Sequence, residues 1–79
     1  MHGKIRLCDM LPGQTGKVFS LSGQCAIHKR LTDLGLITGT EVECVMKSPL
    51  GDPTAYLIRG ALIALRHEDA KYILIERKG

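Results

Sequence analysis

The stretch between Ala26 and Leu36 constrains this chain most, because it encodes a short helix together with the point where the helix ends. Its apolar residues recur at i, i+4 and i+7 and give the helix one face to bury: Ile27, Leu31 and Leu34. Gly35 stands where a residue at positive φ closes the last turn, so that Leu36 can fold back onto the helix. The pattern predicts an α-helix over about residues 23–34 with Ser22 as its N-cap.

The residues around this helix fit the same interpretation. Lys29 and Asp33 are spaced i, i+4 on the polar side, where an ion pair is worth only about 0.3 kcal/mol. Burial of the apolar face must therefore do most of the stabilising. Gly39 and Thr40 follow after a short turn and open an alternating strand, so the helix is joined closely to a sheet.

Short apolar or alternating segments make up most of the remaining chain. They predict about five short strands: residues 16–21, 40–47, 54–59, 61–65 and 72–76. Residues 4–7 have the composition of a further brief strand, and residues 67–70 fit one helical turn.

Breaks between these segments bear on how the sheet curls. The prolines and the glycine of Ser48–Pro53 predict a loop. Gly60 interrupts an extended run, which suggests a bulge or a sharp bend that lets a small sheet curl. The sequence therefore predicts a mainly β protein, a small barrel with one inserted helix.

Length and composition limit the class of protein. A chain of 79 residues is expected to form one domain over residues 1–79, with frayed ends at about 1–4 and 77–79. The longest apolar run, Ala61 to Leu65, is far short of the roughly 20 residues that span a bilayer, and the chain starts without an apolar targeting segment. We therefore expect a cytoplasmic protein that does not insert into membranes. The net charge of +3 comes without a run of Lys or Arg, so nothing signals nucleic-acid binding.

Several ordered motifs resemble the FeoA family, the small cytoplasmic accessory proteins of bacterial ferrous-iron uptake. The matching pieces are Leu11-Pro12-Gly13, Gly16-Lys17-Val18, Lys29 to Leu36, Gly39-Thr40, Ser48 to Pro53, Arg59-Gly60, Ile63 to Arg66 and Asp69-Ala70. They run in order from about Leu7 to Glu76. The resemblance implies an SH3-like β-barrel and a non-enzymatic role exerted on the transporter FeoB and its cytoplasmic GTP-binding region.

A metal-binding alternative rests on the helix. Cys25 and His28 are three residues apart, and a thiolate with an imidazole suits Zn²⁺ or Fe²⁺. A third ligand would have to come from elsewhere in the chain, and no spacing selects one of the candidates: His2, Cys8, Cys44 and His67. We therefore predict weak Fe²⁺ or Zn²⁺ binding at most, with no cofactor required. The rival function is a metal-responsive sensor akin to the C-terminal domain of iron-dependent repressors.

Catalysis is not indicated. No third residue orients His28 toward Cys25, and the carboxylates of Glu41 and Glu43, spaced i, i+2, are explained by a solvated strand face. Three cysteines without a C-x-x-C spacing are expected to be reduced thiols.

Partner binding is the remaining hypothesis for the surface. Basic residues near the matched motifs form a candidate cationic patch: Lys29, Arg30, Arg59 and Arg66. Arg30 and Arg66 also suit a structural role, laying their stems over the barrel and pairing with Asp33, Glu68 or Asp69, and we favour that role for both. Leu50, at the tip of its loop, could dock into a partner or cap the barrel. An exposed strand edge would also allow a homo-oligomer.

Overall fold

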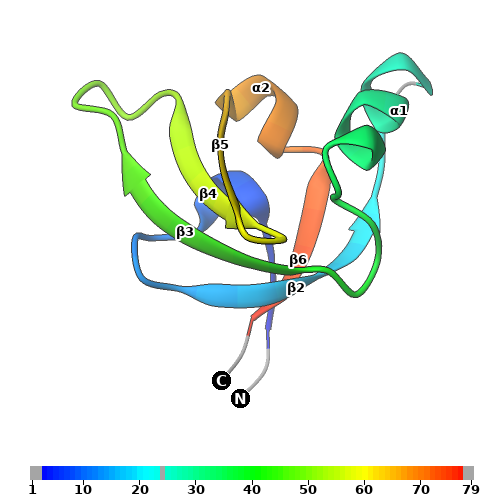
Figure 1. The fold of residues 1–79 in the computed structure, drawn as a ribbon, viewed down its shortest axis with the longest axis horizontal. Helices are drawn as coiled ribbons and strands as arrows, with labels where there is room; N and C mark the ends of the chain where they lie inside the picture. The colour runs from blue at the N-terminus through cyan, green and yellow to red at the C-terminus, as the bar shows by residue number, and fades with distance from the viewer. Residues whose placement is uncertain (1–2, 24, 78–79) are drawn as a thin grey trace.

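The computed structural model describes residues 3–23 and 25–77, apart from the side chain of Cys25. Its strands are β1 (Lys4–Arg6), β2 (Thr15–Leu21), β3 (Glu41–Lys47), β4 (Thr54–Ile58), β5 (Ala61–Leu65) and β6 (Ile73–Arg77). They form one antiparallel sheet in the order β1-β6-β2-β3-β4-β5. A 3₁₀ turn η1 (Leu7–Asp9) and the helices α1 (Cys25–Asp33) and α2 (His67–Ala70) join the strands (Figure 1).

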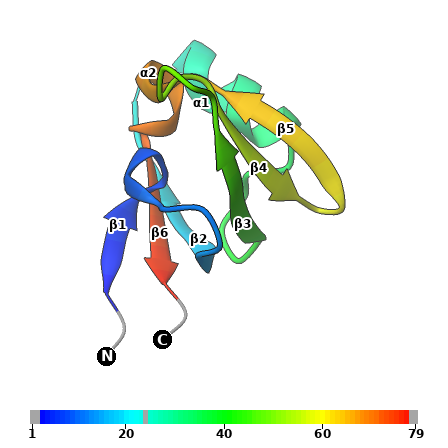
Figure 2. The ribbon, with the colours of Figure 1, turned by 90° about the vertical axis from the view of Figure 1, so that its left-hand side faces the viewer.

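The sheet is bent into two halves. Figure 2 shows β1, β6 and β2 on one side and β3, β4 and β5 on the other, with both helices at the end away from the termini. The strand register shifts between Val18 and Ser20 and again between Cys44 and Met46. Such irregularities strengthen the local twist, which helps a small sheet to fold over its own core.

The mainly β class with one inserted helix and a helical turn at 67–70 is confirmed, and the structure has six strands where the sequence predicted about five. The expectation of frayed ends is wrong at Lys4 and Arg77. Lys4 lies in β1 and Arg77 lies in β6. Lys4 is paired with Glu76, and the Arg77 N–H donates to the Gly3 carbonyl at 2.9 Å. Residues 1, 2, 78 and 79 lie outside the described residues. Within the described part, no helix is long and apolar enough to cross a membrane.

The end of α1 confirms the prediction made from Gly35. Gly35 has φ of +99°, and the Leu36 N–H donates to the Leu31 carbonyl at 3.1 Å. The Gly35 N–H donates to Thr32 at 2.9 Å, which completes a Schellman ending. Leu31 and Leu36 are both fully buried, so the predicted apolar contact is anchored in the core.

The start of α1 differs from the prediction. The helix begins at Cys25, so Ser22 lies too far upstream to be its N-cap. The Ser22 hydroxyl instead donates to the Tyr72 carbonyl at 3.3 Å, which attaches this segment to the chain leading into β6. The polar pair predicted on the helix is not formed either, because no ion pair joins Lys29 to Asp33 within the described residues.

Gly60 also has a different role from the one predicted. Arg59 and Gly60 both have positive φ, +52° and +82°, and they form a two-residue turn between Ile58 and Ala61. This is the backbone of the tight turns that join antiparallel strands. The chain therefore reverses at Gly60, and β5 returns alongside β4 rather than continuing it around a bend.

The core lies between the two halves of the sheet and beneath the helices. It is built from residues far apart in the chain: Leu7, Cys8, Met10, Val18, Leu31, Leu36, Val42, Cys44, Tyr56, Ile58, Leu65, Ala70, Ile73 and Ile75. Ile27 and Leu34 are half-buried and pack against this core. Full burial of one such aliphatic side chain is worth about 1.5–3 kcal/mol, so the helix is held mainly by its apolar face.

Candidate functional site

Two of the thiols that the sequence offered as metal ligands, Cys8 and Cys44, are part of the core. The Cys8 Sγ lies 3.9 Å from Asp9 Oδ1, and the Cys44 thiol is directed to the Met10 carbonyl at 3.7 Å. Burial raises the pKa of both thiols, which disfavours the thiolate that a metal or an electrophile needs. Cys8 and Cys44 therefore act as small buried residues.

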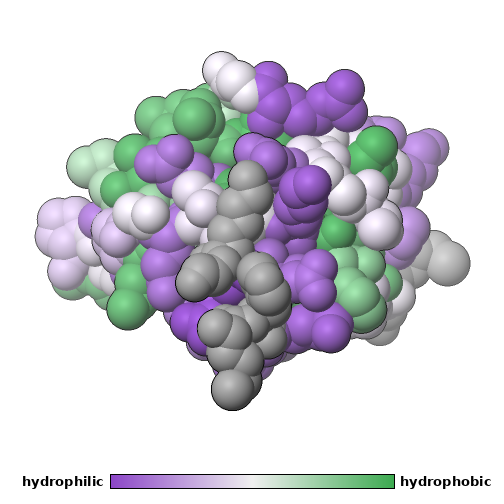
Figure 3. All heavy atoms as spheres, turned by 90° about the horizontal axis from the view of Figure 1, so that it is seen from below, coloured by the Kyte–Doolittle hydropathy of each residue, from purple (hydrophilic) through white to green (hydrophobic). Residues whose placement is uncertain are grey.

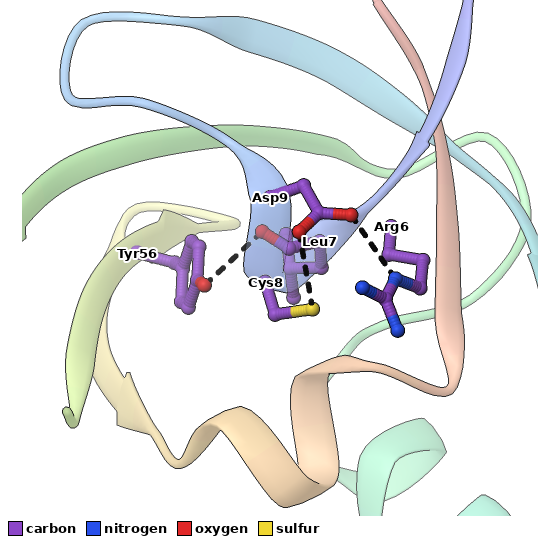
Figure 4. Close-up of polar contacts among 5 residues, drawn as sticks. All are labelled: Arg6, Leu7, Cys8, Asp9 and Tyr56. Carbon is purple, nitrogen blue, oxygen red and sulfur yellow. Dashed lines mark hydrogen bonds and ion pairs between the residues drawn. The ribbon is translucent and has the colours of Figure 1, made fainter. Parts of the chain in front are cut away.

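A buried phenol lies beside the same turn. Figure 4 shows the Tyr56 hydroxyl pointing at the Leu7 carbonyl, to which it donates at 3.2 Å. Burial raises the pKa of Tyr56, so this group is a neutral donor at physiological pH. On the outer side of the turn, Arg6 pairs with Asp9 at 3.0 Å. This cluster joins β4 to the segment after β1 and has a structural role.

The metal hypothesis gains no support from the described residues. The side chain of Cys25 and all of His2 lie outside them. His28 is exposed on α1 and lines a shallow hollow together with Leu21, Thr32 and Ile37. In residues 3–23 and 25–77, so far as their side chains are described, no three His, Cys, Asp or Glu side chains come together as a metal site. The side chains that the structure describes therefore do not form a metal site.

Arg30 joins the two helices. Its guanidinium forms an ion pair with the carboxylate of Asp69, whose side chain is only 13% exposed. Such a charge needs a partner, because burying an unpaired carboxylate is costly. This contact supports the structural role that the sequence favoured for Arg30. Arg66 differs, since its side chain is exposed and makes no ion pair within the described part of the chain.

Arg59 lies across the end of α1. A Cβ placed on Gly35 would come within 2.8 Å of the Arg59 Cδ, so the stem of the arginine covers the glycine. Two motifs that are far apart in sequence, the helix end and the β4–β5 turn, are thus in contact. The guanidinium end of Arg59 is presented at the surface, because the residue as a whole is exposed.

Leu50 and Arg66 lie on segments joined by a hydrogen bond. The loop Ser48–Pro53 is attached to α2 through Asp52, whose Oδ1 accepts the N–H of His67 at 2.9 Å. This contact gives an acceptor to a backbone N–H at the start of α2, which has no partner within the helix. Leu50 stands at the loop tip and is 95% exposed, so it does not cap the barrel.

The predicted basic residues thus divide into groups. Arg30 is tied to α2, Arg59 lies in the β4–β5 turn against the end of α1, and Arg66 immediately precedes α2. Lys29 is exposed on α1 and makes no ion pair within the described chain. The structure therefore connects these positions through the two helices, but it does not gather all four charges into one patch.

The sequence analysis missed an apolar outer face on the half of the sheet formed by β3, β4 and β5. Four large apolar residues are exposed there: Val45, Met46, Leu57 and Leu62. In the register of the sheet, Leu57 lies opposite Leu62, and Met46 lies opposite Ala55. Continuous apolar runs hid this face, because they do not tell outward positions from inward ones. In the structure the burial of β4 alternates, with Tyr56 and Ile58 buried and Leu57 exposed, but its sequence does not show this alternation.

A hollow of about 410 Å³ adjoins this face. It is lined by Thr15, Thr40, Glu41, Val42, Glu43, Leu57, Arg59 and Gly60. Glu41 and Glu43 do lie on one side of β3, as their spacing predicted, beside the turn that carries Arg59. Apolar surface is not confined to this region, since Figure 3 shows apolar residues at the sides of the view from below and hydrophilic ones toward its middle.

The fold is a small curled antiparallel sheet whose exposed features are spread over turns and strand edges. The match to the FeoA domain covers residues 5–77. The chain belongs to the FeoA domain family, and the resemblance drawn from its motifs is confirmed. The family is a non-catalytic accessory domain, so the prediction that the chain is not an enzyme is confirmed as well.

Individual relatives agree with this assignment. The chain is 31% identical over 72 residues to an Fe(2+) transport protein A/Fe(2+) transporter FeoB fusion protein of Porphyromonas gingivalis, which covers 91% of the chain but 8% of the fusion. Its fold is similar to that of a FeoA-like protein from Clostridium acetobutylicum, with 32% identity, a TM-score of 0.87 and coverage of 94% and 86% of the two chains.

A third relative bears on both the fold and the metal. This is the FeoA of Stenotrophomonas maltophilia, named as an SH3 domain protein and solved in complex with zinc. It is 29% identical, has a TM-score of 0.79, and the match covers 90% of this chain and 88% of that one. The predicted SH3-like fold is thereby confirmed. Zinc binding belongs to that relative and has no counterpart in the described residues here.

Proposed function

We propose that this protein is a cytoplasmic accessory protein of ferrous-iron uptake that acts by binding a FeoB-type transporter. The observation that carries this proposal is the fusion relative, in which a FeoA domain and a FeoB transporter form one polypeptide. In the fused relative the linker holds the two parts at high effective concentration, an arrangement that suits parts working in contact. We propose the same contact between separate chains here. The partner region is the cytoplasmic GTP-binding part of the transporter.

The contact surface in this proposal includes the C-terminal end of α1 and the N-terminal end of α2. Arg59 and Arg66 present exposed guanidinium groups, which make bidentate contacts to carboxylates. Lys29 adds a further exposed charge on α1, and Leu50 adds an apolar tip. Arg30 contributes indirectly, by fixing α1 against α2 through Asp69. The protein modulates transport by docking and performs no chemistry of its own.

Titration by interferometry against the purified GTP-binding domain and against the full-length transporter tests the proposal. We expect the double variant Lys29→Glu, Arg59→Glu to weaken binding at least about tenfold, because charge reversal turns attraction into repulsion at the contact. The matched control is Lys17→Glu, Lys71→Glu, which changes the net charge equally at β2 and after α2. Equal losses in both double variants would mean a non-specific charge effect and would count against this surface.

The same experiment distinguishes transporter binding from the alternative function, a metal sensor. Absence of transporter binding under every nucleotide condition would contradict the proposal. If calorimetry then found a tight one-to-one Fe²⁺ or Zn²⁺ complex that Cys25→Ser removes, the sensor function would replace it. Zinc in the Stenotrophomonas maltophilia relative is the observation that keeps this alternative worth testing.

A further inference from the structure

The free edge of β5 offers unpaired backbone groups. β5 ends the sheet and pairs only with β4 within the described residues, and Figure 2 shows it at the outer margin of its half. The two-residue turn makes Ile58 and Ala61 a closing pair, so Ile63 and Leu65 also direct their N–H and C=O groups toward β4. Leu62 and Ala64 direct theirs away from it. No turn, loop or cap hydrogen bond of the described backbone reaches these two residues.

The side chains of this edge do nothing to block a further strand. β5 has no charged residue and no proline from Ala61 to Leu65, whereas edge strands are normally protected by charges, prolines or bulges. Leu62 is 62% exposed and lies opposite the exposed Leu57, so the edge continues the apolar outer face of β4. Ile63, half-buried on the other side, borders the core. An added strand would find apolar contacts on both of its faces.

Positive charges stand at both ends of this apolar edge. Arg59 precedes β5 in the tight turn, and Arg66 follows its last residue; both are exposed. We infer that the β5 edge binds an extended segment of a partner protein by strand addition, with apolar residues at the centre of the segment and acidic residues at its ends. Backbone hydrogen bonds to Leu62 and Ala64 would supply affinity, and the two arginines would set register and select the partner.

A second copy of this chain fits the edge less well. A two-fold antiparallel pairing centred on Ile63 sets Gly60 opposite Arg66 of the other copy, by the register rule of antiparallel strands. Arg59 of one chain then approaches Arg66 of the other, and this happens twice in the dimer. Like charges opposed across strands are destabilising, whereas carboxylates at these ends would pair with them. The charge pattern therefore favours an acidic segment over self-pairing.

The inference rests on the proposed function in one respect, the identity of the protein that carries the added segment. The properties of the β5 edge do not depend on the proposed function. The probe is a short synthetic peptide with alternating valines and isoleucines between acidic ends. A second peptide keeps the centre and has lysines at both ends. Titration followed by amide exchange of the full chain measures affinity and locates the contact.

We expect the acidic peptide to slow exchange at Leu62 and Ala64 and to bind at least about tenfold more tightly than the lysine-ended peptide at low salt. Ala64→Pro should abolish binding, because it removes an outward N–H while leaving the bonds to β4 in place. If Ala64→Pro fails to fold, Leu62→Glu serves as the second edge variant, and it too should abolish peptide binding. Arg66→Gln should weaken binding several-fold, whereas Lys71→Gln, which removes the same charge elsewhere, should not.

Three results would overturn the inference. The first is equal binding of the two peptides, and the second is protection from exchange at residues outside β5. The third is a chain that binds neither peptide but forms a dimer in sedimentation experiments, with the dimer lost in Ala64→Pro. The outcomes for the transporter are distinguishable. Transporter binding that survives Ala64→Pro would keep the proposed function and would reject the transporter as the carrier of the added strand. Peptide binding at β5 without transporter binding would keep strand addition and reject the proposed function.

Discussion

The two edges of the sheet, β1 and β5, are exposed to the same risk of unwanted pairing, yet they differ in how they are protected. β1 is only Lys4–Arg6, with a charge on each side of Ile5 and an ion pair from Arg6 to Asp9. β5 is longer, carries no charge and leaves Leu62 exposed. Because a short charged edge resists added strands, β1 is closed to partners and β5 is open. This difference is what the strand addition proposed at β5 requires.

The largest expected effect tests what holds β5 in place. Leu65 is the buried end of this strand, and Leu65→Ala should destabilise the fold by about 2–5 kcal/mol through lost burial and the cavity left behind. Leu62→Ala, on the outer face of the same strand, is the control and should change stability by about 1 kcal/mol or less. Urea denaturation measures both. Similar losses for the two variants would show that the inner and outer faces of β5 are not distinct.

The next effect concerns the link between the two halves. Tyr56→Phe removes the hydroxyl that joins β4 to Leu7 and leaves a buried carbonyl without its donor. We expect a loss of about 1–3 kcal/mol in the free energy of unfolding. Tyr72→Phe is the matched control, since the Tyr72 hydroxyl makes no hydrogen bond in the described residues. A thermal melt in which both variants match the parent protein would rule out a stabilising role for this contact.

The same phenol predicts how stability depends on alkaline pH. Burial raises the pKa of Tyr56 in the folded state above its unfolded value of about 10, so the fold favours the neutral form. The corresponding stability is fully present below the unfolded pKa and is lost as pH rises through the folded pKa. Burial raises the pKa of Cys44 in the same direction, so its share starts to fall above an unfolded value of about 8.5. Denaturation midpoints should therefore decrease from mildly alkaline pH upward, and less steeply above pH 10 in Tyr56→Phe.

The smallest expected effect lies at the protected edge. Arg6→Gln removes the exposed ion pair with Asp9 and should change the melting temperature little, with a difference that disappears in high salt. The variant also tests whether two copies of the chain associate through β1, because it removes one of the charges that protect this strand. Sedimentation of Arg6→Gln at high concentration should show the same oligomeric state as the parent protein, since Lys4 and the shortness of β1 remain. Association of this variant beyond that of the parent protein would mean that one arginine accounts for the difference between the edges.

Local signals were sufficient for part of this protein. The spacing of Ile27, Leu31 and Leu34 and the glycine after them predicted α1 and its ending, because helix faces and Schellman hydrogen bonds involve residues only a few positions apart. The alternation of β3 likewise predicted one buried face and one outer face. The motifs identified the family, although none of them indicated which surface binds a partner.

Tertiary structure decided the rest, and the physical reason is sequence separation. The Tyr56–Leu7 hydrogen bond, the Arg30–Asp69 ion pair and the cover of Gly35 by Arg59 join residues distant in the chain. Each contact exists only once strand order is fixed and every strand has its register, which depends on the turns and on packing across the whole sheet. The reversal at Gly60 is the clearest case. A glycine fits both a bend and a hairpin, and only the pairing of β5 with β4 chose the hairpin, which made β5 an edge.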